Sequence, residues 1–390
     1  MYFRLFLLVF LAAGFCQASL IGFDVLGQEQ SPKNAAIIRN GLAPQNPAVN
    51  AFENRTKFST AILFEYANAS EGDNSIGLNS FTTPSLSMVL PLGSLGVFGI
   101  GLEQKYFASN RLELRDQSLD ANILYTIRTG LYELAPSYSL RLPFYNNFAL
   151  GVSYRILFGN SFSALQRGTS QDWESDLWMA RNVVVTERET GHFEMKGDWW
   201  QQLGGSVHFH KRFVDYFFSY FPAVEMQKNI RHNVQFSNAD TLKSTKDSVA
   251  FNIPEHFASG VHFLFLKKHN LSLVYEQQNW EKTDLMEVQK AFSCLVEYKI
   301  TGTGLHYTSF LKRNNFGVNA WYAEKYLKDV SELGISVFSD LWLGRRGTLA
   351  SLALFGGYRD TKDPYWDEAF FGFKLNLTGV GNWGTSSRRR

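Results

Sequence analysis

The sequence predicts an all-β fold, a transmembrane antiparallel β-barrel of about 14 strands. Three observations predict it: strands that alternate apolar with polar or small residues, connections that alternate in length, and a high aromatic content. The 390 residues include 34 Phe, 17 Tyr and 9 Trp, beside 31 Gly and only 10 Pro. Such a composition is unusual for a soluble enzyme and typical of membrane barrels, which carry aromatic residues at both membrane interfaces.

Composition and charge exclude several other classes of protein. Hydrophobic residues make up 45% of the chain, so neither a disordered protein nor a small disulfide-stabilised fold is expected. Lys and Arg number 38 against 36 Asp and Glu, and this formal net charge of +2 argues against nucleic acid as a partner. Mean hydropathy is -0.17. Beyond the first ~20 residues, no apolar run reaches the ~18 residues of a membrane-spanning helix.

The N-terminus has the pattern of a secretory signal peptide. Arg4 supplies the positive charge, residues 5–15 form the apolar region, and cleavage is expected after Ala18. A lipoprotein signal with Cys16 as the lipidated residue is the alternative, but bulky Phe15 stands where a small residue is normally required. We therefore expect an exported protein whose first 18 residues take no part in the fold.

Residues 131–158 show the clearest strand alternation. One parity of the first strand carries the apolar side chains Tyr132, Leu134, Pro136, Tyr138, Leu140 and Leu142. The other parity carries Glu133, Ala135, Ser137, Ser139 and Arg141. Residues 144–147 then supply a turn, and residues 148–158 repeat the alternation, so the two segments are expected to form a hairpin.

The second face of these strands distinguishes a barrel from a soluble sandwich. A sandwich turns its polar parity to water, so that face would be rich in Lys, Glu and Thr. Here the second parity is often Gly, Ala or Ser, and the apolar parity carries Tyr and Phe toward the strand ends. We therefore expect the apolar parity to face lipid and the other to face a narrow polar lumen. A large secreted β-sandwich or a repetitive β-fold is the alternative.

Short connections alternate with long ones along the chain, as in outer-membrane barrels. The long connections are expected at about 68–82, 108–129, 159–201, 232–255, 282–290 and 360–366. The strands between the connections are 57–67, 83–91, 95–107, 130–142, 147–158, 202–212, 215–230, 256–266, 270–281, 291–311, 316–327, 332–343, 348–359 and 367–377. An even count places both ends of the barrel on the periplasmic side. Residues 301–304 could be a bend within one strand or a turn between two, and a turn would make the count odd.

Charged residues on the second parity are expected in the lumen, because an Arg in the middle of the bilayer costs about 2 to 4 kcal/mol. The candidates are Glu103, Lys105, Glu133, Arg141 and Arg155. They could line a polar path or anchor a luminal segment. The alternative is a structural ion-pair network that fills the barrel.

The longest connection, residues 159–201, carries four tryptophans. Trp173, Trp178, Trp199 and Trp200 could form an apolar surface that captures hydrophobic cargo, or they could pack together as a cap over the loop. The sequence does not distinguish these two interpretations.

No catalytic or metal site is predicted. His208 and His210 lie on one face of a strand and could offer two ligands to Zn or Cu, but no third ligand is identifiable nearby in the sequence. A G-x-S-x-G motif and a Gly-rich phosphate loop are both absent, so we expect neither enzyme activity nor a cofactor. Cleavage of the signal would remove Cys16 and leave Cys294 as the single cysteine, so no intrachain disulfide is expected.

Residues 19–56 precede the first expected strand, show no clean periodicity and contain the motif Asn46-Pro47-Ala48. On these features the layout resembles the FadL-type long-chain fatty-acid transporter family, which are 14-stranded outer-membrane barrels. The resemblance implies that residues 19–56 form a hatch inside the lumen, with Asn46, Pro47 and Ala48 on the substrate path. An ordinary turn opening the first strand is the alternative interpretation of the motif.

The C-terminal end is consistent with this layout. Residues 370–383 and the terminal Arg388, Arg389 and Arg390 resemble the last strand and short basic tail of related barrels of the Bacteroidota and Fibrobacterota type. The expected organisation is a signal peptide at 1–18, a hatch at 19–56, a barrel at 57–379 and a basic tail at 380–390.

The resemblance also implies a mechanism. Cargo would diffuse from the extracellular loops into the barrel, pass a hatch movement and leave sideways where the third strand kinks. Gly99 and Gly101 lie in that strand and are candidates for the lateral gate, because glycine tolerates a kink. The alternative is that these glycines only face a crowded lumen. Release into lipid avoids rehydrating an apolar chain, at roughly 0.8 kcal/mol per CH₂.

The sequence thus predicts a passive, porin-like transporter of hydrophobic small molecules such as fatty acids, in the outer membrane of a Gram-negative bacterium. Outer-membrane lipid and hydrophobic cargo are the expected partners, together with proteins of the cell envelope. The alternative is a non-transporting barrel that serves as a scaffold, an adhesin or a secretion-system component. A continuous apolar tunnel from the loops to a gap in the wall would favour transport.

Overall fold

The structure of the chain is a computed structural model. It describes residues 28–29, 45–71, 74–83, 85–116, 121–168, 185–194, 200–236, 243–280, 288–305, 307–343, 348–361 and 367–381. The expected signal peptide, most of the expected hatch and most of the basic tail lie outside these ranges, as do Trp173, Trp178 and Trp199.

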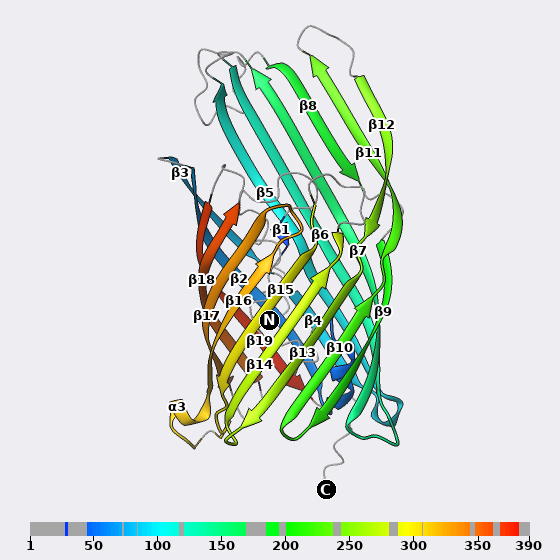
Figure 1. Cartoon of the computed structure of the whole chain (residues 1–390), viewed down its shortest axis with the longest axis vertical. Coiled ribbons are helices and arrows are strands. Elements are labelled where there is room, and N and C mark those ends of the chain that lie inside the picture. The colour runs from blue at the N-terminus through cyan, green and yellow to red at the C-terminus, as the bar shows by residue number, and fades with distance from the viewer. Residues whose placement is uncertain are drawn as a thin grey trace.

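Fourteen antiparallel strands form a closed barrel in the described residues (Figure 1). They are β2 Thr56–Glu71, β4 Ser85–Pro91, β5 Val97–Asp116, β6 Ala121–Arg141, β7 Phe148–Gly168, β9 Trp200–Lys211, β10 Val214–Phe221, β13 His256–Phe265, β14 His269–Gln278, β15 Ala291–Ile300, β16 Asn315–Glu324, β17 Val330–Leu343, β18 Thr348–Thr361 and β19 Asp367–Gly381. Each strand pairs with the next one in this order, and β19 pairs with β2 from Asp367↔Ser70 to Gly381↔Thr56. The predicted 14-stranded barrel is confirmed.

Five further strands belong to the same sheet. They are β1 Gln28–Glu29, β3 Asn74–Thr82, β8 Val185–Glu194, β11 Val224–Phe236 and β12 Lys243–Ile253. The helices of the described residues are short, namely η1 Pro47–Phe52, η2 Gly93–Leu95 and α3 Phe310–Arg313. None of them has the length and hydrophobicity needed to cross a membrane.

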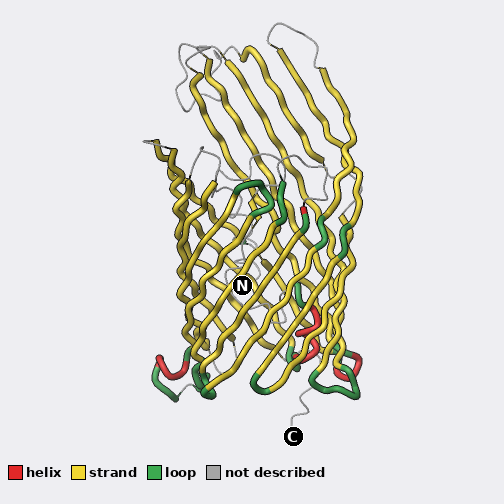
Figure 2. The backbone as a smooth tube through the Cα atoms, in the orientation of Figure 1, coloured by secondary structure: helices red, strands yellow, loops and turns green. Residues whose placement is uncertain are grey.

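The two ends of the barrel differ. Tight turns at 92–96, 142–147, 212–213 and 266–268 lie at one end, which we call the short-turn end. At the other end, strands β5 to β8, β11 and β12 rise beyond the rest of the barrel, and we call this the extended end (Figures 1 and 2). Because Thr56 pairs with Gly381, β2 begins and β19 ends at the same end of the barrel, as predicted.

Several expected loops contain strand. Residues 68–82, 108–129, 159–201 and 232–255 were predicted as connections, yet β2, β3, β5 to β8, β11 and β12 run through large parts of them. These residues have no continuous apolar parity, so their sequence resembles that of loops, but backbone ladders alone can extend a sheet into water. The prediction of long connections was wrong there.

The ambiguous range 291–311 contains one strand. β15 ends at Ile300, and the described residues 301–305 and 307–309 lie outside strands and precede α3. Thr301 therefore begins the link between β15 and β16, and the strand count stays even.

Side chains point as the alternation predicts. Val337 and Leu354 on the outer face are 63% and 61% exposed, while Arg155, Glu332 and Arg359 on the inner face are buried. Exposed apolar and buried charged side chains reverse the pattern of a soluble protein and fit a wall that faces hydrocarbon. The alternative of a β-sandwich, which would bury the apolar parity, is excluded. Cys294, a free thiol on β15, is also exposed on the outer face.

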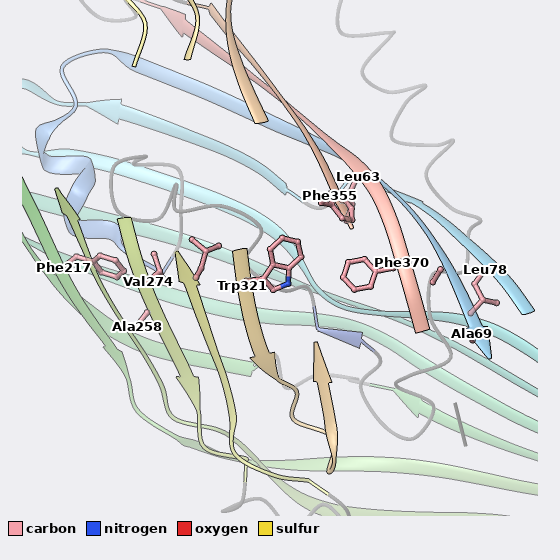
Figure 3. Close-up of a cluster of buried hydrophobic side chains, with 11 residues drawn as sticks. Leu63, Ala69, Leu78, Phe217, Ala258, Val274, Trp321, Phe355 and Phe370 are labelled. Atoms are coloured by element: carbon pink, nitrogen blue, oxygen red, sulfur yellow. The ribbon is translucent and has the colours of Figure 1, made fainter. Parts of the chain in front are cut away.

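One part of the inner wall is apolar. Buried side chains from neighbouring strands form a cluster there, of which Figure 3 shows the members around Trp321 and Phe370. The cluster consists of Leu63, Ala67, Ala69, Leu78, Phe217, Ala258, Val274, Leu295, Trp321, Phe355 and Phe370. In barrel order it runs from β10 through β13 to β16 and on to β18, β19, β2 and β3. The lumen therefore offers an apolar surface beside its charged one.

Candidate functional site

A cavity of about 40 Å³ lies in the lumen where charged and aromatic residues meet. Its walls come from β5, β6, β7, β9, β13 and β14 and from the connections next to them. The lining residues are Lys105, Tyr106, Glu133, Arg155, Leu157, Gln202, Ile253, Pro254, His256, Gln278 and Trp280. The volume is small, since a cavity of about 150 Å³ is needed to hold one benzene molecule.

Two prolines shape this level of the barrel. Pro222 follows β10 and Pro254 precedes β13, and a proline interrupts a strand because it has no N–H to donate. The side-chain amide of Gln202 on β9 donates hydrogen bonds to both proline carbonyls, at 2.7 Å and 3.2 Å. The Gln202 amide thereby provides hydrogen bonds to two carbonyl groups beside the cavity that lie outside the strand ladders.

Beside Lys105, the cavity is lined by a second cationic residue, Arg155. The residue is 5% exposed, and its guanidinium lies 3.2 Å from the centre of the Phe221 ring. Its Nη1 donates to Nδ1 of His256 at 3.2 Å, and its Nε lies 3.6 Å from Oε1 of Glu133, too far for a hydrogen bond. Nε and Nη2 have no hydrogen-bond partner among the described residues. The cavity therefore holds a buried cation with donors still to satisfy.

Aromatic residues also line the cavity, namely Tyr106 and Trp280. The ring of Tyr106 meets Trp280 edge-on at 6.1 Å and Tyr326 at 6.0 Å, while the rings of Trp280 and Tyr326 are 5.1 Å apart. Leu131 and Leu157 complete this buried cluster. A molecule with one anionic group and an apolar body would find a complementary surface for each part.

The even parity of β5 carries Phe98, Ile100 and Leu102, and simple alternation would place Tyr106 on the same lipid-facing side, which is wrong because Tyr106 is buried. A β-bulge shifts the register between Gln104 and Tyr106 against β6, so that the parity of β5 changes there. Tyr106 is buried as a result. The bulge residue Lys105 also lines the cavity. A bulge of this kind leaves no clear signal in a single sequence.

The predicted luminal charges fall into two groups. Lys105, Glu133 and Arg155 come together at the cavity. Glu103 lies close by and accepts a hydrogen bond from the Gln45 amide at 3.3 Å. Arg141 lies away from them at the short-turn end, where its guanidinium stacks on Phe52 at 4.7 Å and donates to the Ala51 carbonyl at 3.5 Å.

A larger ion-pair network was not predicted. Arg359 on β18 contacts Glu65, Glu332 and Glu368 at 2.5 Å, 2.9 Å and 3.2 Å, and Lys325 reaches Glu332 at 3.2 Å. All five side chains are buried. The signal that could have found the network was the inward parity of Glu332 and Arg359 on adjacent expected strands.

The motif Asn46-Pro47-Ala48 lies against the inner wall. Asn46 and Ala48 are fully buried, and Pro47 begins η1. The backbone N–H of Ala48 donates to Ser206 Oγ at 2.8 Å. Gly151 on β7 allows this close approach, because a Cβ at that position would overlap the backbone of Ala48. The segment is therefore packed in the lumen, while a movement of residues 19–56 as a hatch stays a prediction.

The candidate gate glycines lie in continuous sheet. At Gly99 and Gly101, β5 is paired with β4 on one side and with β6 on the other. A Cβ at Gly99 would lie 2.6 Å from Ser137 Oγ and 2.9 Å from Asn50 Nδ2, which favours the interpretation of a glycine facing a crowded lumen.

The wall is interrupted two residues further along β5. The ladder between β4 and β5 ends at the pair Ser85↔Glu103. Beyond it, no ladder joins β3 to β5 in the residues that the structure describes, and β5 pairs instead with β1 at Tyr106 and Phe107. The interruption therefore borders Tyr106, which also lines the cavity.

The candidate capture residues are not placed by the structure. Trp173, Trp178 and Trp199 lie outside the described residues. Trp200 begins β9, where its backbone pairs with Leu157. The role of these four tryptophans stays a prediction.

Comparison with known proteins identifies the fold. No protein-family model and no curated protein matches the sequence. Among solved structures, the chain is similar to a FadL homologue of Pseudomonas aeruginosa, with a TM-score of 0.60 and 10% identity over 94% of this chain and 99% of that one. It is also similar to the toluene transporter TbuX of Ralstonia pickettii, with a TM-score of 0.53 and 13% identity over 94% and 98%. For the toluene transporter TodX of Pseudomonas putida, the TM-score is 0.54 with 11% identity over 95% and 100%.

These identities are low, and the likeness extends over almost the whole length of each chain. The contacts within the chain itself define the 14-stranded barrel and the packing of residues 46–52 in its lumen. The chain therefore has the fold of the FadL homologue and of the two toluene transporters.

Proposed function

We propose that this protein is an outer-membrane channel through which hydrophobic small molecules diffuse passively, with fatty acids as the preferred cargo. Cargo enters from the extended end, passes the cavity at Arg155 and leaves sideways into the bilayer between β3 and β5. One observation carries the proposal, namely that a cavity with aromatic and cationic sides borders an interruption of the wall. The transport functions named for the proteins of like fold support it.

The open donors of Arg155 favour a carboxylate over an uncharged hydrocarbon. A buried donor without a partner costs about 1 to 3 kcal/mol, and more when the group is charged. A fatty-acid carboxylate would satisfy Nε and Nη2 of Arg155 together. Its chain would contact Tyr106, Leu157 and Trp280. Toluene has no group that could do the same.

The proposed exit follows from the apolar surface of the lumen. The cluster around Trp321 ends at Leu78 on β3, which is one of the two strands that flank the interruption. Since the cavity at Arg155 is only about 40 Å³, cargo must displace lining side chains to pass. A movement of the hatch is part of the proposal through the resemblance to the FadL-type family.

Uptake of labelled oleate by cells with and without the gene tests the function. We expect uptake to require the gene and to fall at least ten-fold in the Arg155→Met variant. Arg212→Met is the control, because Arg212 lies in the exposed turn between β9 and β10, over the Phe213 ring and away from the cavity, and its uptake should match the wild type. Equal uptake in cells with and without the gene would remove the transport function.

A specific observation supports the alternative of a scaffold, adhesin or secretion component. Strands β5 to β8, β11 and β12 extend far beyond the other strands and present paired sheet outside the barrel (Figure 2). Such a surface is suited to binding a cell-envelope protein. The same uptake experiment separates the two functions, since a scaffold predicts no dependence of oleate uptake on the gene.

A further inference from the structure

Three side chains with metal-binding groups meet at the short-turn end of the lumen. His208 and His210 lie on the inner parity of β9, and Asp215 on β10 stands directly opposite His210 across the hairpin. The ligand atoms of the three residues lie within 4.8 Å of one another. The β9–β10 hairpin thus supplies the third ligand that the sequence did not reveal.

We propose that His208, His210 and Asp215 bind a divalent first-row transition metal such as Zn²⁺. Two imidazoles and a carboxylate form a donor set that these cations accept. Bonds of about 2.1 Å in a tetrahedral site place neighbouring ligand atoms roughly 3.4 Å apart. Small side-chain rotations therefore bring the three groups to metal-binding distance.

Burial supports the assignment. Asp215 is 0% exposed and His208 is 1% exposed, whereas the His210 side chain is 48% exposed. The Asp215 carboxylate contacts His210 Nδ1, so the two groups already share one small volume. A buried carboxylate gains from a nearby cation, and the exposed side at His210 leaves a route by which the ion and its water can enter.

The N-terminal segment supplies a supporting group. The Asn46 amide lies 3.4 Å from Nδ1 of His208. A histidine that binds metal through one nitrogen usually hydrogen-bonds through the other, and such a partner fixes the ring. The Asn46 amide nitrogen faces Nδ1 in the structure, and a flip of the side-chain amide places its carbonyl oxygen there, where it accepts a hydrogen bond from Nδ1–H of a metal-bound His208. The ring of Phe52 packs on His208 at 5.4 Å and on His210 at 5.0 Å.

Metal binding would therefore hold residues 46–52 against the wall. The cation fixes the rings of His208 and His210, and the segment contacts both rings through Asn46 and Phe52. The effect of the metal on the position of residues 46–52 does not depend on the nature of the cargo.

Isothermal titration of the full-length protein with ZnCl₂ tests the site. The protein is purified in detergent without a polyhistidine tag and treated with a chelator before titration. We expect one Zn²⁺ per chain in the wild type and at least ten-fold weaker binding in His210→Ala and in Asp215→Asn. His269→Ala is the matched control, because His269 lies on β14 and contacts Tyr298, and its affinity should be unchanged.

Two further measurements keep the test decisive. Far-UV circular dichroism and the heat-dependent gel mobility of folded barrels identify the variants that fold. The site can be tested with either His210→Ala or Asp215→Asn, provided that the variant folds. In Asn46→Ala we expect about ten-fold weaker binding, and in the wild type we expect Zn²⁺ to slow hydrogen exchange at residues 46–52. Wild-type affinity in a folded His210→Ala or Asp215→Asn variant overturns the site. Wild-type affinity in Asn46→Ala overturns the supporting role of Asn46.

Discussion

The most constrained residue in the lumen is Arg359, whose guanidinium contacts three carboxylates. Each of its three nitrogens has its own partner, because Nε contacts Glu332, Nη1 contacts Glu368 and Nη2 contacts Glu65. The side chain also stacks on Phe370 at 4.2 Å. The planar fork of arginine permits this arrangement, and the single ammonium of lysine could not reproduce it.

Replacing Arg359 with Met should destabilise the barrel by about 3 to 5 kcal/mol, because it leaves buried carboxylates without their cation. Urea unfolding in lipid vesicles measures the effect. The control is Lys57→Met, since Lys57 pairs with Glu53 near the surface and such pairs contribute about 1 kcal/mol or less. Equal losses in the two variants would contradict the structural role given to the network.

At the residue scale, the structure places three of the predicted luminal charges, Lys105, Glu133 and Arg155, at the lining of the cavity. Tyr106 was missed because a bulge reverses the parity of β5 after Gln104, and Asp215 was missed because its partner His210 lies across a turn. The spacing of residues within one strand shows neither a bulge nor the exact register across a turn, so neither position was found.

At the scale of elements, β5, β6 and β7 each combine a barrel strand with an extension into water. β5 and β6 stay paired up to Asp116↔Ala121, far beyond the last pair between β4 and β5 at Ser85↔Glu103. The barrel ladders and the extension ladders are therefore separate sets of hydrogen bonds. Sequence reasoning found the barrel parts of these three strands and missed their extensions, which have no lipid-facing parity. It also made two strands too long, because the strand expected at 215–230 ends at Phe221 in β10 and the one expected at 291–311 ends at Ile300 in β15.

Deleting residues 109–128 and joining the ends with a short turn should leave the barrel folded. The remaining ladders of β5 and β6 still close the wall, and loops tolerate such changes at small cost. We expect heat-dependent gel mobility and oleate uptake like those of the wild type. Loss of folding would show that the extension is required for the barrel. Normal folding with lost uptake would show that the extension acts in transport.

For the whole molecule, the apolar outer face of the barrel indicates that the wall lies in a membrane. Val337 lies in the middle of β17 and is 63% exposed on the outside of the closed wall. The overall fold was predictable because two opposite environments, hydrocarbon outside and a polar lumen inside, impose one period on every strand. The proposed path of cargo was less predictable, since it depends on where the 46–52 segment packs and where ladders end.

An arginine at Val337 should cost about 2 to 4 kcal/mol of unfolding free energy in lipid vesicles, because the middle of the bilayer cannot solvate it. Phe144→Arg is the control. Phe144 lies in the turn at the short-turn end and is 92% exposed, so its replacement should cost about 1 kcal/mol or less. Similar costs at the two positions would contradict the placement of the hydrocarbon band.

The exposed thiol of Cys294 gives the barrel a built-in reporter. Its neighbours on the outer face of β15 are Phe292 and Val296, so a dye attached there would sit among acyl chains instead of in water. Its emission would shift to shorter wavelength on insertion and would be quenched by brominated lipid. Membrane insertion could thus be followed in real time without mutating the protein.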